Sequence, residues 1–127
     1  MQEKHLFEYA VIRVVPRVER EEFMNVGVIV YCQSQRFLSV KYHLPAERLQ
    51  CFSSDLDIEE IEKNLHAFEQ ISKGGRESGP IGQQPIVSRF RWLTATRSTV
   101  LQTSPVHLGL CDDLDGKIES LFKNLVS

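Results

Sequence analysis

The spacing of apolar residues in the first third of the chain predicts three β-strands. Residues 6–15 carry β-branched or aromatic side chains on both alternating faces, which is typical of an internal strand covered on two sides. Pro16 lacks an amide donor and ends the pairing. Residues 25–32 form a second strand of the same kind, and residues 36–43 alternate apolar and polar positions. The short link between these two predicts an antiparallel hairpin.

After the third strand, the apolar residues recur at helical spacing. Pro45 suits the first position of a short helix over 45–52. A longer helix is expected over 58–73, because its apolar residues recur three and four positions apart and its acidic first turn and basic last residue match the helix dipole. Residues 74–85 contain several glycines and predict a flexible loop.

The last third of the chain mixes both periodicities. Residues 85–93 predict a short helix, and residues 98–103 a fourth strand. Pro105 places this strand at an edge of the sheet or ends it early. A C-terminal helix follows, with Asp112 or Asp113 as its N-cap.

This order of elements predicts an α+β fold with a mainly antiparallel sheet of about four strands and helices packed on it. The length of 127 residues suits a single domain over residues 1–127, and the chain has no internal repeat or linker. We expect the face that the strands expose to be covered by Leu56, Ile61, Leu65, Phe68, Leu121 and Leu125.

Composition limits the classes of function. Hydrophobic residues make up 42% and charged residues 25%, which is the balance of a globular protein and not of a disordered one. The net charge of -2 gives no overall attraction to nucleic acid or to an anionic membrane, so an anion site must be local. Cys32, Cys51 and Cys111 form no CxxC motif and are interpreted as reduced packing residues. With no signal-peptide or membrane-spanning run, a cytoplasmic protein is expected.

The candidate site lies in a stretch dense in arginine, aromatic and hydroxyl side chains, residues 89–109. Its first part belongs to the helix expected over 85–93, which leaves residues 97–107. Arginine forks match carboxylate and phosphate groups, and alternate residues of a strand share one face. The candidate ligand-binding residues are Arg13, Arg97, Ser98, Gln102 and His107. Equally, these polar groups can serve only to hold an edge strand in place.

Arg13 joins this set because it lies in the middle of the first predicted strand, where a buried guanidinium is costly unless it is paired. Two interpretations remain open. Glu21, Glu22 or an acid of the C-terminal helix pairs with it, or it faces a ligand. The decisive question is whether Arg13 and the residues over 97–107 line one cleft.

No motif for catalysis, metal or cofactor binding stands out. The chain has no G-x-S-x-G elbow, and its histidines share no short spacing with other strong metal ligands. We therefore favour a binding or accessory protein that recognises an anionic ligand or a protein partner through residues 97–107. An enzyme acting on a phosphorylated or nucleotide-like substrate, with His107 as acid or base, is the alternative. Nucleic-acid binding through arginines and aromatics near Trp92 is weaker, given the net charge.

Three segments carry a resemblance to a known family. They are YAVIRVVP with EFMNVGVIVYC, RFRWLTATRSTVLQTSPVHLGL, and DDLDGKIESLFKNLV, at residues 9–16 with 22–32, 89–110 and 112–126. In this combination and order the chain resembles the DUF3037 family of small bacterial proteins. The resemblance implies a bacterial, stand-alone domain of uncharacterised function with no catalytic set to transfer. Genes of this family often neighbour those of HipA-like kinases, which implies such a kinase as a partner by association only; the oligomeric state stays open.

Overall fold

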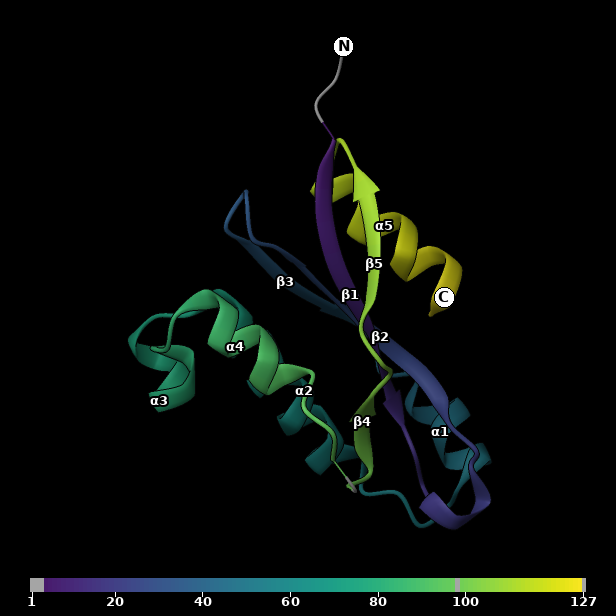
Figure 1. Ribbon diagram of the computed structural model, residues 1–127. Coiled ribbons are helices and arrows are strands. Elements are labelled where there is room, and N and C mark those ends of the chain that lie inside the picture. Colours follow the sequence, from purple (N-terminus) through teal and green to yellow (C-terminus); the bar gives the residue numbers. More distant parts are fainter. Residues whose placement is uncertain (1–3, 98, 127) are drawn as a thin grey trace.

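The computed structural model describes residues 4–97 and 99–126, and an antiparallel sheet of five strands runs through it (Figure 1). The strands are β1 His5–Val14, β2 Met24–Cys32, β3 Phe37–Tyr42, β4 Leu101–Thr103 and β5 His107–Cys111. Their order is β3-β2-β1, and both β4 and β5 pair with the remaining edge of β1. The α+β prediction is confirmed, with one strand more than expected.

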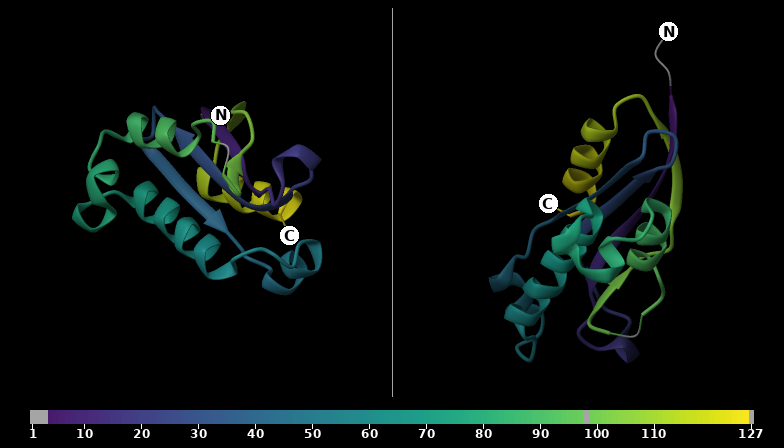
Figure 2. Two further views of the ribbon diagram at one scale, coloured as in Figure 1. Left: turned by 90° about the horizontal axis from the view of Figure 1, so that it is seen from below. Right: turned by 90° about the vertical axis from the view of Figure 1, so that its left-hand side faces the viewer.

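Five α-helices and two single turns of 3₁₀ helix complete the described chain (Figure 2). The helices are α1 Ala46–Phe52, α2 Ile58–Lys73, α3 Gly79–Gly82, α4 Ile86–Leu93 and α5 Leu114–Leu125. The 3₁₀ turns are η1 Val18–Arg20 and η2 Arg76–Ser78. The predicted glycine loop over 74–85 therefore contains two short helical turns. No helix within the described residues is long and apolar enough to cross a membrane.

The two faces of β1 pack into two separate cores, as its apolar pattern predicts. Ile12 and Val14 are buried with residues of α2 and α4. Phe7 is buried on the opposite face with Ile118 of α5. The helices thus divide between the faces, and the expectation that Leu121 and Leu65 cover one face is wrong. Helical periodicity shows that a helix has an apolar side, but not which face of the sheet receives it.

The extra strand arises because two separate segments pair with the second edge of β1. Predicted strand 98–103 shortens to β4, and the chain returns to β1 as β5 after a break at Ser104 and Pro105. At the break, the Val11 amide donates to Ser104 Oγ at 2.8 Å and the Ser104 amide donates to the Val11 carbonyl at 2.8 Å. These bonds bridge the interruption that the proline imposes on the ladder, so the edge continues.

The ends of α2 are held by the chain on both sides. The side chain of Asp57 accepts a hydrogen bond from the Glu60 amide at 3.2 Å, which is an N-cap. At the other end, Arg89 Nη1 donates to the carbonyls of Ile71 and Ser72 at 3.0 and 2.9 Å. These bonds anchor α4 to the C-terminus of α2, and α2 thereby has a defined position beside the sheet.

Candidate functional site

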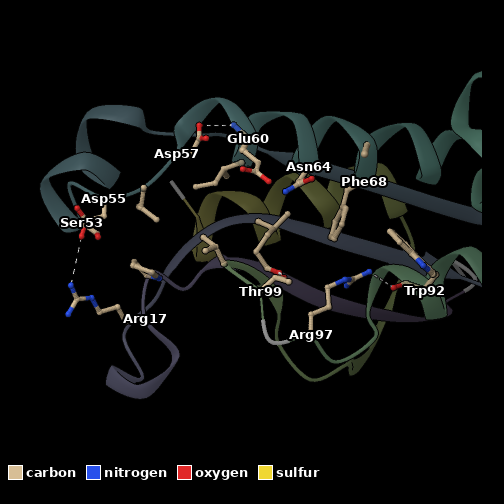
Figure 3. Close-up of a pocket in the computed structure, with 16 residues that line it drawn as sticks. Arg17, Ser53, Asp55, Asp57, Glu60, Asn64, Phe68, Trp92, Arg97 and Thr99 are labelled. Carbon is tan, nitrogen blue, oxygen red and sulfur yellow. Dashed lines mark hydrogen bonds and ion pairs between the residues drawn. The ribbon is translucent and has the colours of Figure 1, made fainter.

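A pocket of about 700 Å³ lies between α2 and the segment that leads into β4 (Figure 3). Glu60, Asn64 and Phe68 of α2 form one wall. They follow one another at four-residue spacing, so they lie in a row along one side of the helix. Figure 3 shows Glu60 and Asn64 pointing into the space that Arg97 and Thr99 border from the other side.

The floor of the pocket is apolar. Ile61, Phe68 and Leu101 line it and are buried in the core shared by α2 and the sheet. At the mouth, Trp92 and Val100 are each 38% exposed, so apolar surface borders the opening. The rings of Phe68 and Trp92 meet edge to face with centroids 6.0 Å apart. A ligand in this pocket would therefore contact aromatic and aliphatic surface.

Arg97 closes the pocket at the end of α4. Its Nη1 donates to the carbonyls of Leu93 and Ala95 at 2.9 and 3.2 Å, and its Nη2 donates to the carbonyl of Trp92 at 2.6 Å. The guanidinium carbon lies 4.6 Å from the ring of Trp92 and 5.0 Å from that of Phe68. Burial lowers the pKa of Arg97 from its ordinary value. The two terminal nitrogens are thus bound to the helix end rather than directed at a ligand.

The acidic side chains of the pocket differ in what they already bind. Asp57 caps α2, and Asp55 lies 3.8 Å from Arg17 in an exposed ion pair. The carboxylate of Glu60 and the amide of Asn64 form no hydrogen bond or ion pair with any part of the chain that the structure describes. The lining has three carboxylates and two guanidinium groups, so its formal charge is negative, and Glu60 is its available charged group.

Comparison with known proteins places the chain in a family. The family model described as "Protein of unknown function (DUF3037)" matches residues 9–126. The chain belongs to the DUF3037 family. No curated protein and no solved structure matches it. The chemistry of a ligand for this DUF3037 protein must therefore be inferred from the pocket itself.

Two of the residues predicted for the site are neighbours in the sheet. Arg13 of β1 and Gln102 of β4 are directly opposite in the register, so their side chains share the face on which α5 lies. The Arg13 guanidinium stacks at 4.0 Å from the centroid of Phe23, and its Nε is buried without a hydrogen-bond partner among the described atoms. Gln102 Nε2 donates to the Thr99 carbonyl at 2.8 Å.

An acidic partner for Arg13 would decide between its two interpretations, and the described residues provide none. Within residues 4–97 and 99–126, the structure records no ion pair between Arg13 and Glu21, Glu22 or an acid of α5. Stacking on Phe23 provides the contact that was expected from a carboxylate. Cation–π contacts of this kind stabilise an arginine by about 0.5–1 kcal/mol at exposed sites.

The other predicted residues lie elsewhere. His107 is opposite Tyr9 with ring centroids 5.2 Å apart, on the same face as Arg13 but four residues along β1. Four residues of strand span roughly 13 Å. Arg97 is on the side of α2 and α4, against Phe68, and Ser98 lies outside the described residues. The structure therefore brings Arg13 and Gln102 together and does not place Arg97 and His107 with them.

The cysteines add no reactive site to this arrangement. Cys32 and Cys111 are buried, as expected, whereas Cys51 is exposed on α1, so its interpretation as a packing residue is wrong. Burial raises the pKa of the Cys111 thiol, and the nearby Cys32 raises it further. Within the described residues, no three metal-ligating side chains come together.

The sequence pattern did not reveal that α2 forms one wall of the pocket. The acidic run that begins α2 has an obvious interpretation as a solvated helix N-terminus, and Asp57 does serve as the cap. The available signal was a polar row, Glu60 and Asn64, that continues at the same spacing into buried Phe68. Such a row follows the border of the apolar stripe, where a side chain reaches either solvent or a pocket.

Proposed function

We propose that this protein is a binding protein whose ligand occupies the pocket between α2 and β4. The ligand has an apolar body, at least partly aromatic, and a positively charged head group that binds Glu60. The observation that carries this proposal is the unpaired carboxylate of Glu60 above an apolar floor. The volume of about 700 Å³ supports it, since ligand pockets measure roughly 300–1,000 Å³.

The electrostatics of the pocket favour a cation over the anion that the arginines suggest. Arg97 has both terminal nitrogens bound to carbonyls, and Arg17 lies beside Asp55. An anion would have to displace one of these partners, whereas a cation meets Glu60 directly.

A binding role also fits better than the catalytic alternative. The catalytic hypothesis assigns proton transfer to His107 and substrate binding to Arg97. A base must come within hydrogen-bonding reach of the proton that it removes. His107 lies on the α5 face with Tyr9, while Arg97 lies on the opposite side with Phe68. The two side chains therefore do not share one substrate in this fold.

Trp92 makes the proposal testable, because it is the single tryptophan of the chain and lines the pocket. We would titrate the protein with phenethylamine, and separately with phenylacetate, following tryptophan fluorescence excited at a wavelength that neither compound absorbs. The two probes share a phenyl ring and differ in the sign of their charge. We expect phenethylamine to bind more tightly than phenylacetate.

Glu60→Gln and Glu59→Gln form a matched pair of variants, since Glu59 is the preceding residue of α2 and does not line the pocket. A unit charge at 4 Å is worth about 1–4 kcal/mol between bulk water and a protein surface. We therefore expect Glu60→Gln to weaken phenethylamine binding at least about 5-fold and Glu59→Gln to leave it unchanged. Equal binding of both probes, or equal effects of both variants, would remove the basis of the proposal.

A further inference from the structure

The outer edge of β5 is open. β5 pairs with β1 along one edge, and no strand within residues 4–97 and 99–126 pairs with its other edge (Figure 1). In an antiparallel ladder, alternate residues direct their N–H and C=O groups to opposite edges. An unpaired edge of this kind is a template for another strand unless charges, a proline or a covering element protect it.

Exposed leucines flank this edge, beside the ion pair that Glu8, the residue opposite Leu108, forms with Arg91. Leu108 and Leu110 of β5 are 67% and 61% exposed, and neighbouring Leu6 of β1 is 59% exposed. Leu6 is directly opposite Leu110 in the register, so the three leucines share one face of the sheet. No residue of β5, His107–Cys111, is a lysine, arginine, aspartate or glutamate. β5 itself therefore carries neither the charged residues nor the proline that protect many natural edge strands.

We propose that the occupant of this edge is a second copy of the chain, with the two β5 strands pairing antiparallel about Gly109. This register is self-complementary: Leu108 of each copy faces Leu110 of the other, and Gly109 faces Gly109. With Leu6 of each copy beside them, six leucines form one apolar cluster across the twofold axis. A bound strand of another protein would gain the backbone bonds but not this matching of leucines.

The charges at the ends of the strand fit the same arrangement. In this register His107 of each copy faces Cys111 of the other, and Asp112 and Asp113 follow directly after that cysteine. The two acidic ends lie at opposite ends of the interface, so they do not repel each other. Each acidic end instead lies beside the His107 end of β5 in the other copy.

The size of the contact sets its strength. One pair of five-residue strands and six leucines bury less than the 1,200 Å² or so that stable interfaces need. The dimer is therefore a weak one with a dissociation constant in the micromolar range, on the order of 10–500 µM. None of the leucines lines the pocket beside α2, so the dimer contact and the pocket share no residue among them.

Sedimentation velocity of the full chain between 5 µM and 1 mM measures the association directly. We expect the wild type to shift from monomer to dimer across this range. Leu108→Lys with Leu110→Lys stays monomeric because four ammonium groups then meet at the axis. Val18→Lys is the control, since Val18 is an exposed residue of η1, which follows the C-terminal end of β1, whereas β5 pairs with the N-terminal half of β1. Circular dichroism confirms that each variant is folded.

Disulfide trapping tests the register. In a Cys51→Ser background, Leu108→Cys and Leu110→Cys proteins are oxidised separately and as a mixture. Pairing about Gly109 makes the mixture cross-link, because residue 108 faces residue 110, and leaves each protein alone largely monomeric. A wild type that is monomeric at 1 mM, a double-lysine variant that associates like the wild type, or equal cross-linking with and without mixing would each overturn the proposal.

Discussion

Arg97→Ala removes the side chain that binds the C-terminus of α4, and we expect it to destabilise the fold strongly for a partly exposed residue. Three hydrogen bonds to carbonyls, at 2.6, 2.9 and 3.2 Å, are lost together with the contacts to Trp92 and Phe68. A hydrogen bond to a charged group contributes about 1.5–3 kcal/mol when buried, and each stacked ring about 0.5–1 kcal/mol.

These contributions must be reduced, because the released carbonyls at the end of α4 can bind water. Counting about one-third of the hydrogen-bond total and one ring contact gives a loss of roughly 2–4 kcal/mol. With a urea m-value of about 2 kcal/mol/M for a domain of this size, the midpoint of unfolding falls by about 1–2 M. The measurement is urea unfolding followed by circular dichroism.

Arg91→Ala is the matched control, because Arg91 is also an arginine of α4. It forms an exposed ion pair with Glu8 at 3.1 Å, and exposed pairs contribute about 0–1 kcal/mol. Arg97→Lys keeps the charge but cannot reach three carbonyls at once, so it recovers less than half of the loss. If Arg97→Ala shifts the midpoint no more than Arg91→Ala, Arg97 does not hold the end of α4 and is free to bind a ligand.

Two further predictions concern the sheet and its surroundings. Ser104→Ala leaves the buried Val11 amide without its acceptor and should cost about 1–3 kcal/mol in urea unfolding, whereas a loss below 0.5 kcal/mol or so would show that this bond does not join β4 and β5. Burial, followed by the charge of Glu62, raises the pKa of Tyr42 above 10.0, so the folded state keeps this proton longer than the unfolded state and loses stability as pH rises through that range. Tyr42→Phe should therefore lose less stability between pH 9 and pH 11 than the wild type, and equal losses would contradict the assignment.

Most of the regular structure could be predicted because it depends on local pattern. Both faces of β1 are apolar. The structure buries Ile12 against α2 and α4 on one face and Phe7 against α5 on the other. Helix α2 spans Ile58–Lys73, the range that its apolar spacing and the charges of its two ends predict. β5 was missed because it contains a glycine and follows Pro105, both of which weaken a strand pattern.

The candidate site was predictable only in part. Arg97, one of the predicted ligand-binding residues, lines the pocket, but its terminal nitrogens donate to backbone carbonyls at the end of α4. The same nitrogens that can bind an anion can also bind backbone carbonyls, and the choice depends on where the preceding helix ends. The carboxylate of Glu60, by contrast, resembles any acid in the first turns of a helix until the opposite wall of the pocket is in place.

The sequence by itself determined the α+β class, the family, the first three strands and the apolar side of each main helix, because these follow from periodicity, capping and residue type. Only the tertiary structure decided which face of the sheet each helix covers, and that Arg13 and Gln102 are separated from Arg97 and His107. The physical reason is that pairing register and helix docking depend on contacts between residues far apart in the chain. The pocket beside Glu60 is lined by three segments that are far apart in the chain. None of these segments has a sequence pattern that by itself indicates a pocket.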